Sequence, residues 1–381
     1  MRKYLTGRKA AGIAAALTLT SALAGPSMAA GAAGAPAGHA LTPAETRMVV
    51  FINSMMTTLQ KEAPKGAAPG TWKGSGACFR CDAGPALALA ASAYLTHNVA
   101  QRRWAKHILD EEIRRHQQEN GAFGTAPGGP DIDTMFFANT LGVSTLLMKS
   151  QMGKPRYTRW TAAVTGAADY LIANKNLAWY TNGNIVIGNT LTMALAYRLS
   201  GDDKYKDAYE TALNFAVSPP PRWAGRGLIY TKKGTRADGR DSKAYFTEAA
   251  NGKVGYDPEY TQVQLATLAP LYLVTRDPRV LSYLNALTNQ LDPRVSKRTW
   301  KLATSGGTRF PQRGRAIPYD TGSLAVLANV GGRHEFRGYL EPQAKMYTRE
   351  FASGEGDRLR GAFGWTAATV IMSQPGRSLP G

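Results

Sequence analysis

Polar side chains of the kinds that move protons gather just before, or at the start of, apolar segments with helical periodicity. They are Asp82, Asp131, Asp133, Asn182, Asn184, Asp257, Glu259, Tyr260, Gln262, Tyr319 and Asp320. Asp and Asn are favoured N-cap residues, so Asp133, Asn184 and Asp320 could each do no more than cap a helix. Capping does not explain the Tyr and Gln side chains beside them, and the set therefore indicates a binding or catalytic site.

One chemistry that these side chains could carry is β-elimination from a uronate sugar. The reaction removes the proton at C5, so it needs a base and groups that neutralise the uronate carboxylate. We predict Tyr260, or Tyr256 in its place, as the base, because a neighbouring arginine lowers the pKa of a phenol. Asn184 and Arg313 are predicted to hold the carboxylate.

Hydrolysis of a glycosidic bond is the alternative chemistry, and it needs two carboxyl groups that flank the bond. Asp133 and Glu259 are the leading pair for that reaction. A third alternative involves no turnover, since a basic surface can also serve only to bind an anionic cell-wall polymer. Because the chain is strongly basic, we predict a polysaccharide lyase first and a glycoside hydrolase second.

The charge of the chain indicates an anionic partner. The formal net charge is +19, and residues 217–257 and 292–319 are rich in Lys and Arg with aromatic residues between them. Basic side chains bind carboxylate or sulfate groups, and Arg does so with two parallel hydrogen bonds. We predict an acidic polysaccharide as the substrate, bound by Arg313, Gln262, Asn182, Trp179, Tyr319 and Arg309. Nothing in the sequence matches a nucleic-acid-binding module, so nucleic acid is not expected as a partner.

Twelve helical segments of two alternating kinds must position these residues. One kind is apolar nearly all round, as expected of buried helices, and comprises 84–96, 133–149, 184–199, 258–274, 320–330 and 361–373. The other kind is amphipathic and comprises 43–61, 98–117, 155–173, 203–216, 277–290 and 335–351. Short polar turns lead from an apolar segment to the next amphipathic one, whereas longer loops rich in Gly, Pro and aromatic residues lead back.

This alternation predicts an all-α fold, an (α/α)6 toroid of six helical hairpins in a single domain over residues 43–373. An open α-solenoid has similar hairpins, but six repeats match the closure of a ring. The long loops would then gather at the N-terminal ends of the inner helices, and loops on a rigid scaffold often carry function. Pro270 is predicted to kink the fourth inner helix or to end it early.

Two short motifs carry a resemblance to a known group of proteins. Residues 255–262 read GYDPEYTQ, and residues 133–136 read DTMF. The first resembles a G-Y-D-x-x-Y element that opens an inner helix in some lyase-like proteins, and the second is similar to the D-x-M-F start of unsaturated-uronyl hydrolases. The chain thus resembles the six-hairpin carbohydrate-active enzymes, which include toroidal polysaccharide lyases, and the resemblance implies a carbohydrate-active enzyme.

The sequence departs from these families in two respects. Toroidal lyases commonly pair a catalytic Tyr with a His and an Asn, but none of the five His residues lies at the start of a predicted inner helix. Asn182 and Asn184 stand where a uronyl hydrolase would have its second catalytic Asp.

The N-terminal segment has the pattern of a signal peptide. Basic residues are followed by an apolar run over 10–24 and by small residues at 27–29. We expect residues 1–30 to be removed on export, residues 31–42 to form a flexible Ala/Gly/Pro lead-in and residues 374–381 to form a C-terminal tail. Loss of the four basic residues of the signal segment leaves a formal charge of +15. The expected mature protein is a secreted monomer that has no membrane contact.

Cys78 and Cys81 are the two cysteines of the chain. The sequence offers no second Cys or His pair at a spacing that would complete a zinc site, and an exported protein meets an oxidising environment. We therefore expect a local Cys78–Cys81 disulfide, and we predict neither a metal site nor a cofactor.

Overall fold

The computed structural model describes residues 40–72, 79–124, 130–350, 356–375 and 379. The chain divides into two units, Met1–Ala40 and Leu41–Gly381, and the described helices and strands all lie in the second unit. None of the described helices is both long and apolar enough to cross a membrane.

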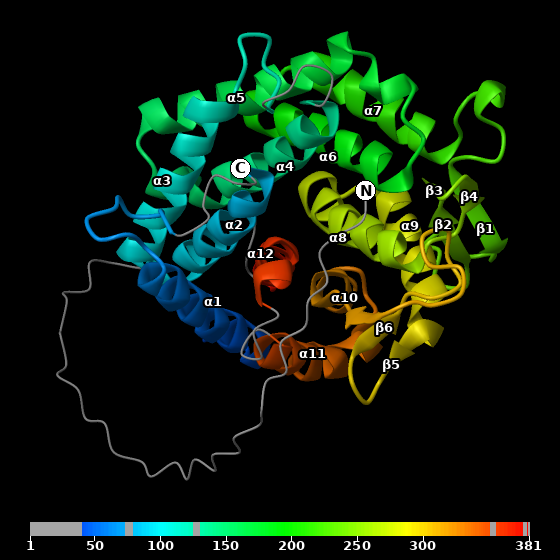
Figure 1. The fold of residues 1–381 in the computed structure, drawn as a ribbon. Coiled ribbons are helices and arrows are strands. Elements are labelled where there is room, and N and C mark those ends of the chain that lie inside the picture. Colours follow the sequence, from blue (N-terminus) through cyan, green and yellow to red (C-terminus); the bar gives the residue numbers. More distant parts are fainter. Residues whose placement is uncertain (1–39, 73–78, 125–129, 351–355, 376–378, 380–381) are drawn as a thin grey trace, which may run out of the picture. The chain divides into compact units, whose positions relative to one another are not determined.

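Six helices of the second unit form an inner ring. They are α2 (Phe79–Thr96), α4 (Pro130–Met148), α6 (Gly183–Ser200), α8 (Pro258–Thr275), α10 (Thr321–Asn329) and α12 (Gly356–Ser373). Each packs on the next, and α12 packs on α2, so that the ring closes (Figure 1). The predicted toroid is therefore confirmed, and the open solenoid is excluded.

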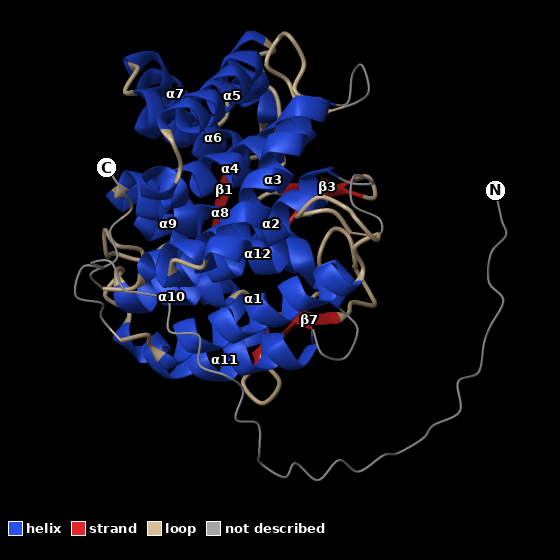
Figure 2. Ribbon diagram, turned by 90° about the vertical axis from the view of Figure 1, so that its left-hand side faces the viewer, coloured by secondary structure: helices blue, strands red, loops and turns tan. Residues whose placement is uncertain are grey.

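Six amphipathic helices surround this ring. They are α1 (Pro43–Lys61), α3 (Val99–His116), α5 (Lys154–Ala173), α7 (Asp203–Val217), α9 (Pro278–Leu291) and α11 (Arg337–Glu350). From α3 to α11, each outer helix packs on the inner helix that precedes it, and α1 packs on α2, α11 and α12. Seen from the side, helices make up nearly all of the described secondary structure (Figure 2).

Burial explains the two kinds of helix. Ile187, Leu191 and Leu195 of α6 are completely buried, and so is Thr190. The Thr190 hydroxyl donates a 2.8 Å hydrogen bond to the carbonyl of Val186, which satisfies a polar group that would otherwise be costly to bury. An inner helix can therefore carry threonines on faces that contact only protein.

The short turns between hairpin partners follow from local backbone chemistry. Gly201 ends α6 with a φ of 73°, a left-handed conformation that Gly adopts without strain. The next residue, Asp202, caps α7, because its carboxylate accepts a 3.0 Å hydrogen bond from the backbone N–H of Lys204. These two residues stop one helix and start the next.

The two long loops contain short antiparallel strands rather than only irregular chain. The strands are β1 (Leu228–Lys232), β2 (Lys243–Phe246), β3 (Glu248–Ala250), β4 (Lys253–Gly255), β5 (Val295–Ser296), β6 (Lys301–Ala303) and β7 (Ala316–Pro318). They pair as β1–β2, β3–β4 and β5–β6–β7. Short 3-10 helices η1 (Lys149–Gln151), η2 (Asn176–Ala178), η3 (Pro221–Trp223), η4 (Asp292–Arg294) and η5 (His334–Phe336) complete the connections. The pairing gives the long loops a fixed backbone.

Pro270 does not end α8, because the helix continues to Thr275. The prediction of an early end is therefore wrong. Pro270 and the residues that follow it, Leu271, Tyr272 and Leu273, are buried, and packing of this kind can hold a helix together across the missing N–H of a proline.

Candidate functional site

Hydrogen bonds bring the N-terminal ends of successive inner helices to one end of the ring, here called the loop end. Tyr180, just before α6, donates to Asp131 in the first turn of α4. The backbone N–H of Asn184 in α6 donates to the loop that precedes α8. The side chain of Gln262 in α8 donates to the carbonyl of Pro318, just before α10. Most of the predicted site residues therefore share the loop end.

Glu248, the first residue of β3, is a buried carboxyl group at this end that was not among the predicted site residues. It is 1% exposed, and its Oε1 accepts hydrogen bonds from the backbone of Asn184 (2.8 Å) and the side chain of Gln264 (2.9 Å). Burial raises the pKa of Glu248 to about 7; the two hydrogen bonds and Arg309 oppose this shift, and Asp257 adds to it. The group therefore exchanges its proton near neutral pH.

A glycine at the start of α6 lets α8 and the end of β2 approach this helix closely. A Cβ on Gly183 would lie 2.5 Å from the Nε2 of Gln264 and 2.5 Å from the Cβ of Phe246. The backbone N–H of Gly183 also donates a 2.9 Å hydrogen bond to the carbonyl of Thr247, directly before Glu248. The start of α6 and the loop before α8 thus form one packed unit around the Glu248 carboxyl group.

Tyr260, the first predicted base, lies half-buried in the first turn of α8 beneath an arginine. The guanidinium carbon of Arg309 is 3.7 Å from the centre of the Tyr260 ring. Burial raises the pKa of Tyr260, Arg309 opposes the rise, and Glu248 and Glu259 add to it. The predicted arginine neighbour is present, but the expected net lowering of the phenol pKa is wrong because burial outweighs it.

The other two tyrosines named from the sequence are more deeply enclosed. Burial raises the pKa of Tyr256 to about 12, although Arg294, 5.7 Å from the ring centre, opposes the rise. Tyr319 is completely buried, and burial raises its pKa well above the ordinary value. Burial therefore keeps both phenols neutral near pH 7.

Asp257 holds the loop that carries Arg309. Its Oδ1 caps α8 by accepting the backbone N–H of Tyr260 at 3.0 Å. Its Oδ2 accepts the hydroxyl of Thr308 at 3.2 Å and the backbone N–H of Arg309 at 2.8 Å. The carboxylate is 1% exposed, so it fixes the position of Arg309 relative to Tyr260.

Three further predicted residues make contacts within the protein. Glu259 accepts a 2.6 Å ion-pair contact from Arg315. Gln262 donates to Pro318 at 2.9 Å and accepts from the backbone of Asp320 at 3.3 Å. Asn182 accepts from the backbone of Ala249 at 3.3 Å. Gln262 and Asn182 thus connect loops to inner helices, whereas Glu259 pairs with the guanidinium of Arg315.

Trp179 forms an aromatic platform with Tyr180. Its side chain is 42% exposed and stacks on Tyr180 with ring centres 3.9 Å apart and an interplanar angle of 25°. Asp131 accepts hydrogen bonds from the hydroxyls of Tyr180 (3.2 Å) and Tyr170 (2.8 Å). Burial, with Asp131, raises the pKa of each of these tyrosines to about 12. One face of the Trp179 ring is therefore backed by an ordered network.

The remaining predicted residues are Asp133, Arg313 and the two cysteines. Asp133 is half-buried in the first turn of α4, and Arg313 is exposed in the loop between β6 and β7. Residue Cys78 and the side chain of Cys81 lie outside the described residues, so the expected disulfide stays a prediction.

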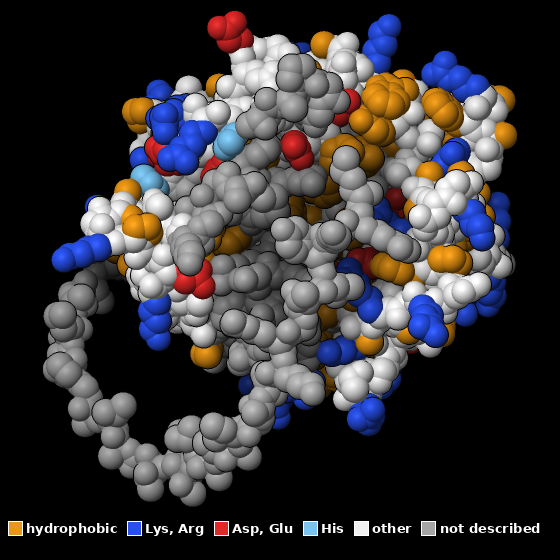
Figure 3. Space-filling model, in the orientation of Figure 1, with side chains coloured by type: hydrophobic (Ala, Val, Ile, Leu, Met, Phe, Trp, Pro, Cys, Tyr) orange, Lys and Arg blue, Asp and Glu red, His pale blue; other side chains and the backbone are white. Residues whose placement is uncertain are grey.

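Basic side chains are spread over the loop region. The exposed basic side chains include Lys232, Lys233, Lys253, Arg309 and Arg313, and Lys and Arg side chains recur over the face drawn in Figure 3.

Among the residues that the structure describes, no group of three or more His, Cys, Asp or Glu side chains is arranged to hold a metal ion. A cavity of about 600 Å³ lies elsewhere, between α5 and the turn after α3.

Comparison with solved structures places this fold among known toroids. A D-mannose isomerase superposes with a TM-score of 0.52 at 11% sequence identity, over 81% of this chain and 87% of that chain. A family 76 glycoside hydrolase from a bovine Bacteroides thetaiotaomicron strain gives 0.47 at 14% identity, over 87% and 77%. A variant of unsaturated glucuronyl hydrolase from Streptococcus agalactiae gives 0.49 at 14% identity, over 88% and 93%. No protein-family profile and no curated protein sequence matches the chain. The chain therefore has the (α/α)6 fold of the six-hairpin enzymes, as its sequence predicts.

Proposed function

We propose that this protein is a carbohydrate-active enzyme that hydrolyses a glycosidic bond in an acidic, uronate-containing polysaccharide, with Glu248 as the proton donor. The observation that carries the proposal is the buried Glu248 carboxyl group, whose pKa is raised to about 7 at the loop end of the ring. A general acid must hold its proton near neutral pH and release it in the transition state. The D-mannose isomerase that shares the fold acts, by its name, on a sugar, which supports carbohydrate as the substrate class.

The hydrogen bonds of Glu248 leave one oxygen for the proton. Asn184 and Gln264 both donate to Oε1, so the proton of the neutral acid belongs on Oε2. In the proposed step this proton moves to the glycosidic oxygen as the bond to the anomeric carbon breaks. A water molecule adds to that carbon and loses its proton to a second carboxylate. We assign this second role to Glu259, beside Arg315, with Asp133 of α4 as the alternative.

The acidic substrate is inferred from the groups that surround these carboxyl groups. Arg309 is exposed and held in place through its own backbone by Asp257, and a guanidinium suits a uronate carboxylate. Trp179 offers an exposed ring face to a sugar. A chain with 46 basic and 27 acidic residues also attracts polyanions in general.

β-Elimination is the second candidate, and the geometry of Arg309 over Tyr260 favours it. In that reaction Tyr260 removes the C5 proton while Asn184 and Arg313 hold the uronate carboxylate. We rank it second because burial raises the pKa of Tyr260 and of Tyr256, whereas a phenolate base needs a lowered pKa. The third candidate is binding of an anionic cell-wall polymer without turnover, and it applies if the protein releases no product.

The products distinguish these functions. The mature protein is incubated with a panel of polyuronates, and new reducing ends are measured together with the absorbance of unsaturated sugars. Hydrolysis gives reducing ends without the double bond, and Glu248→Gln lowers their release. Absorbance that rises with chain cleavage, and is abolished by Tyr260→Phe, would establish elimination instead.

From the signal-peptide pattern of residues 1–30 we further propose that the enzyme acts outside the cell.

A further inference from the structure

A cavity with the chemistry of anion binding lies where the β1–β2 hairpin packs on the outer helix α9. Its volume is about 310 Å³, and its wall includes four basic side chains, Lys232, Lys243, Arg240 and Arg333, and two carboxylates, Asp241 and Asp292. We call it the hairpin pocket. None of the residues proposed for the glycosidic reaction lines it.

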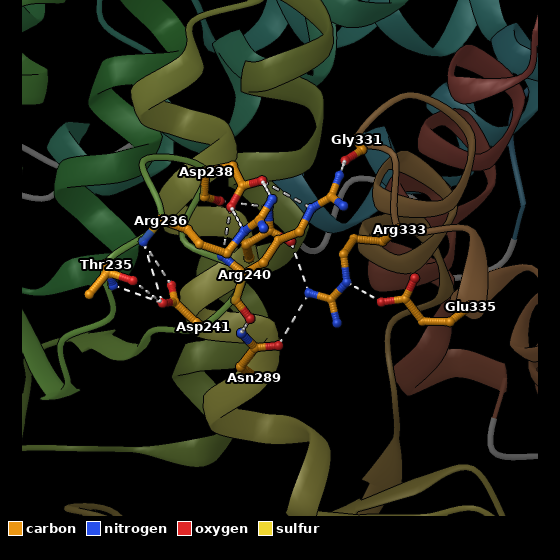
Figure 4. A network of polar contacts seen from close by, with 10 residues as sticks. Thr235, Arg236, Asp238, Arg240, Asp241, Asn289, Gly331, Arg333 and Glu335 are labelled. Carbon is orange, nitrogen blue, oxygen red and sulfur yellow. Dashed lines mark hydrogen bonds and ion pairs between the residues drawn. The ribbon is translucent and has the colours of Figure 1, made fainter.

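The two arginines are fixed in place by protein groups. Arg240 donates from Nη2 to the carbonyl of Gly331 at 2.8 Å and contacts Asp238 with Nε at 3.2 Å. Arg333, whose side chain is 12% exposed, pairs through Nε with Glu335 and donates from Nη1 to Asn289 at 3.3 Å (Figure 4). Fixed guanidinium groups lose little further freedom when they bind an anion.

The two carboxylates of the wall are already engaged. Asp241 accepts hydrogen bonds from the backbone N–H of Thr235 at 2.7 Å and from the hydroxyl of Thr235 at 3.1 Å. Asp292 forms an ion pair with Lys297. Asp292 is thus paired with a lysine outside the pocket wall, and Asp241 is oriented by its own loop.

Lys232 and Lys243 are direct partners across the β1–β2 ladder. Directly opposed side chains of like charge repel each other, and neither lysine forms an ion pair with another residue that the structure describes. An oxyanion between them would convert this repulsion into two charge-assisted hydrogen bonds. The Nη2 of Arg333 holds no hydrogen bond to a described residue and can supply a third donor.

We propose that the hairpin pocket binds one oxyanion, a carboxylate, sulfate or phosphate group. The chemistry that recognises it is two lysine ammonium groups beside two fixed guanidinium groups. When the oxyanion belongs to a polymer, the pocket is a second point of attachment, and a second attachment raises the local concentration of chain at the first. The proposal does not depend on the glycosidic reaction, because it concerns binding alone.

The test compares two double variants of the full chain that lose the same charge. Lys232→Gln with Lys243→Gln changes the hairpin pocket, whereas Lys154→Gln with Lys206→Gln changes two exposed lysines of α5 and α7. Inorganic phosphate and polygalacturonate are titrated in separate calorimetric experiments at constant ionic strength. Circular dichroism checks that both variants are folded.

We expect the pocket variant to bind at least one of these probes about tenfold more weakly than wild type, because it loses charge-assisted hydrogen bonds. The control variant should bind within about twofold of wild type. Loss of phosphate binding alone identifies free phosphate as the ligand, and loss of polygalacturonate binding alone identifies a polymer carboxylate. Equal affinities of the two variants for both probes, or no measurable binding of either probe by wild type, would overturn the proposal.

Discussion

The side-chain amide of Gln264 and the backbone N–H of Asn184 converge on one oxygen of Glu248, at 2.9 and 2.8 Å. The two donors belong to neighbouring inner helices, α8 and α6, so the carboxyl group joins them through β3. Both hydrogen bonds favour the ionised carboxylate, yet burial outweighs them and raises the pKa to about 7. This group therefore affects the folding stability as well as the proposed chemistry.

The pKa of Glu248 predicts how stability depends on pH. Its ordinary value is 4.5, so between about pH 4.5 and 7 the folded protein keeps a proton that the unfolded chain has released. The free energy of unfolding therefore falls as pH rises through this interval, by roughly 3 kcal/mol from this group alone. Urea unfolding of wild type and Glu248→Gln at pH 5 and pH 8 measures the difference. The variant should lose less stability between the two pH values than wild type, and parallel profiles would contradict the assignment.

Gly183→Ala should destabilise the protein by about 1–3 kcal/mol, because the added Cβ meets Gln264 and Phe246 at 2.5 Å. Gly338→Ala in α11 is the matched control, since no heavy atom lies within 4 Å of its added Cβ and Ala is a better helix former than Gly. Thermal unfolding of the two variants should shift in opposite directions. A Gly183→Ala protein as stable as wild type would show that α8 and the end of β2 do not pack so closely on α6.

Arg309→Ala should weaken binding of an acidic polysaccharide by about tenfold and leave binding of a neutral glycan unchanged, because one charge-assisted contact is lost. Arg298→Ala removes the same charge from an exposed position in the same long loop and should have little effect. Affinities at low and moderate salt are compared for both variants, since salt screens exposed charges. Equal losses in the two variants would indicate that only net charge matters.

Trp179→Ala should raise the dissociation constant of the polysaccharide about three- to tenfold, which is the range expected when one aromatic contact is lost. Tyr197, which is 37% exposed near the C-terminal end of α6, provides the control. Tyr197→Ala removes an exposed aromatic ring at the opposite end of an inner helix and should leave affinity unchanged. If the two substitutions have the same effect, the Trp179 ring is not a sugar platform.

The helices could be read from the sequence because their signals are local. Apolar positions recur all round the segment that becomes α6, and Gly201 and Asp202 mark its end and the start of the next helix. The gathering of the long loops at one end of the ring was also predictable, because long segments precede α8 and α10 in the sequence. The closure of the ring was predictable from the number of hairpins and from the alternation of the two kinds of helix.

Glu248 escaped sequence reasoning because its environment is made by distant residues. Asn184 lies 64 positions away and Gln264 lies 16 positions away. In the sequence, nothing distinguishes Glu248 from Asp238 and Asp241 of the same basic loop. The predicted lowering of the Tyr260 pKa is wrong for a related reason. The sequence indicates the arginine neighbour but not the extent to which Tyr260 is buried. The local sequence pattern shows which ionisable side chains are present, whereas their desolvation depends on the packing of the whole fold.

The most direct test of the central claim measures Glu248→Gln on two kinds of substrate. A polyuronate needs its leaving oxygen protonated, whereas an aryl uronide with an acidic phenol as leaving group does not. The variant should lose at least about a hundredfold in kcat on the polymer and less than about tenfold on the aryl uronide, since a positioned general acid contributes roughly 10²–10⁴-fold. Glu119→Gln, at an exposed position, should change neither rate. If Glu248→Gln keeps wild-type kcat on the polymer, or loses both activities equally, Glu248 is not the proton donor.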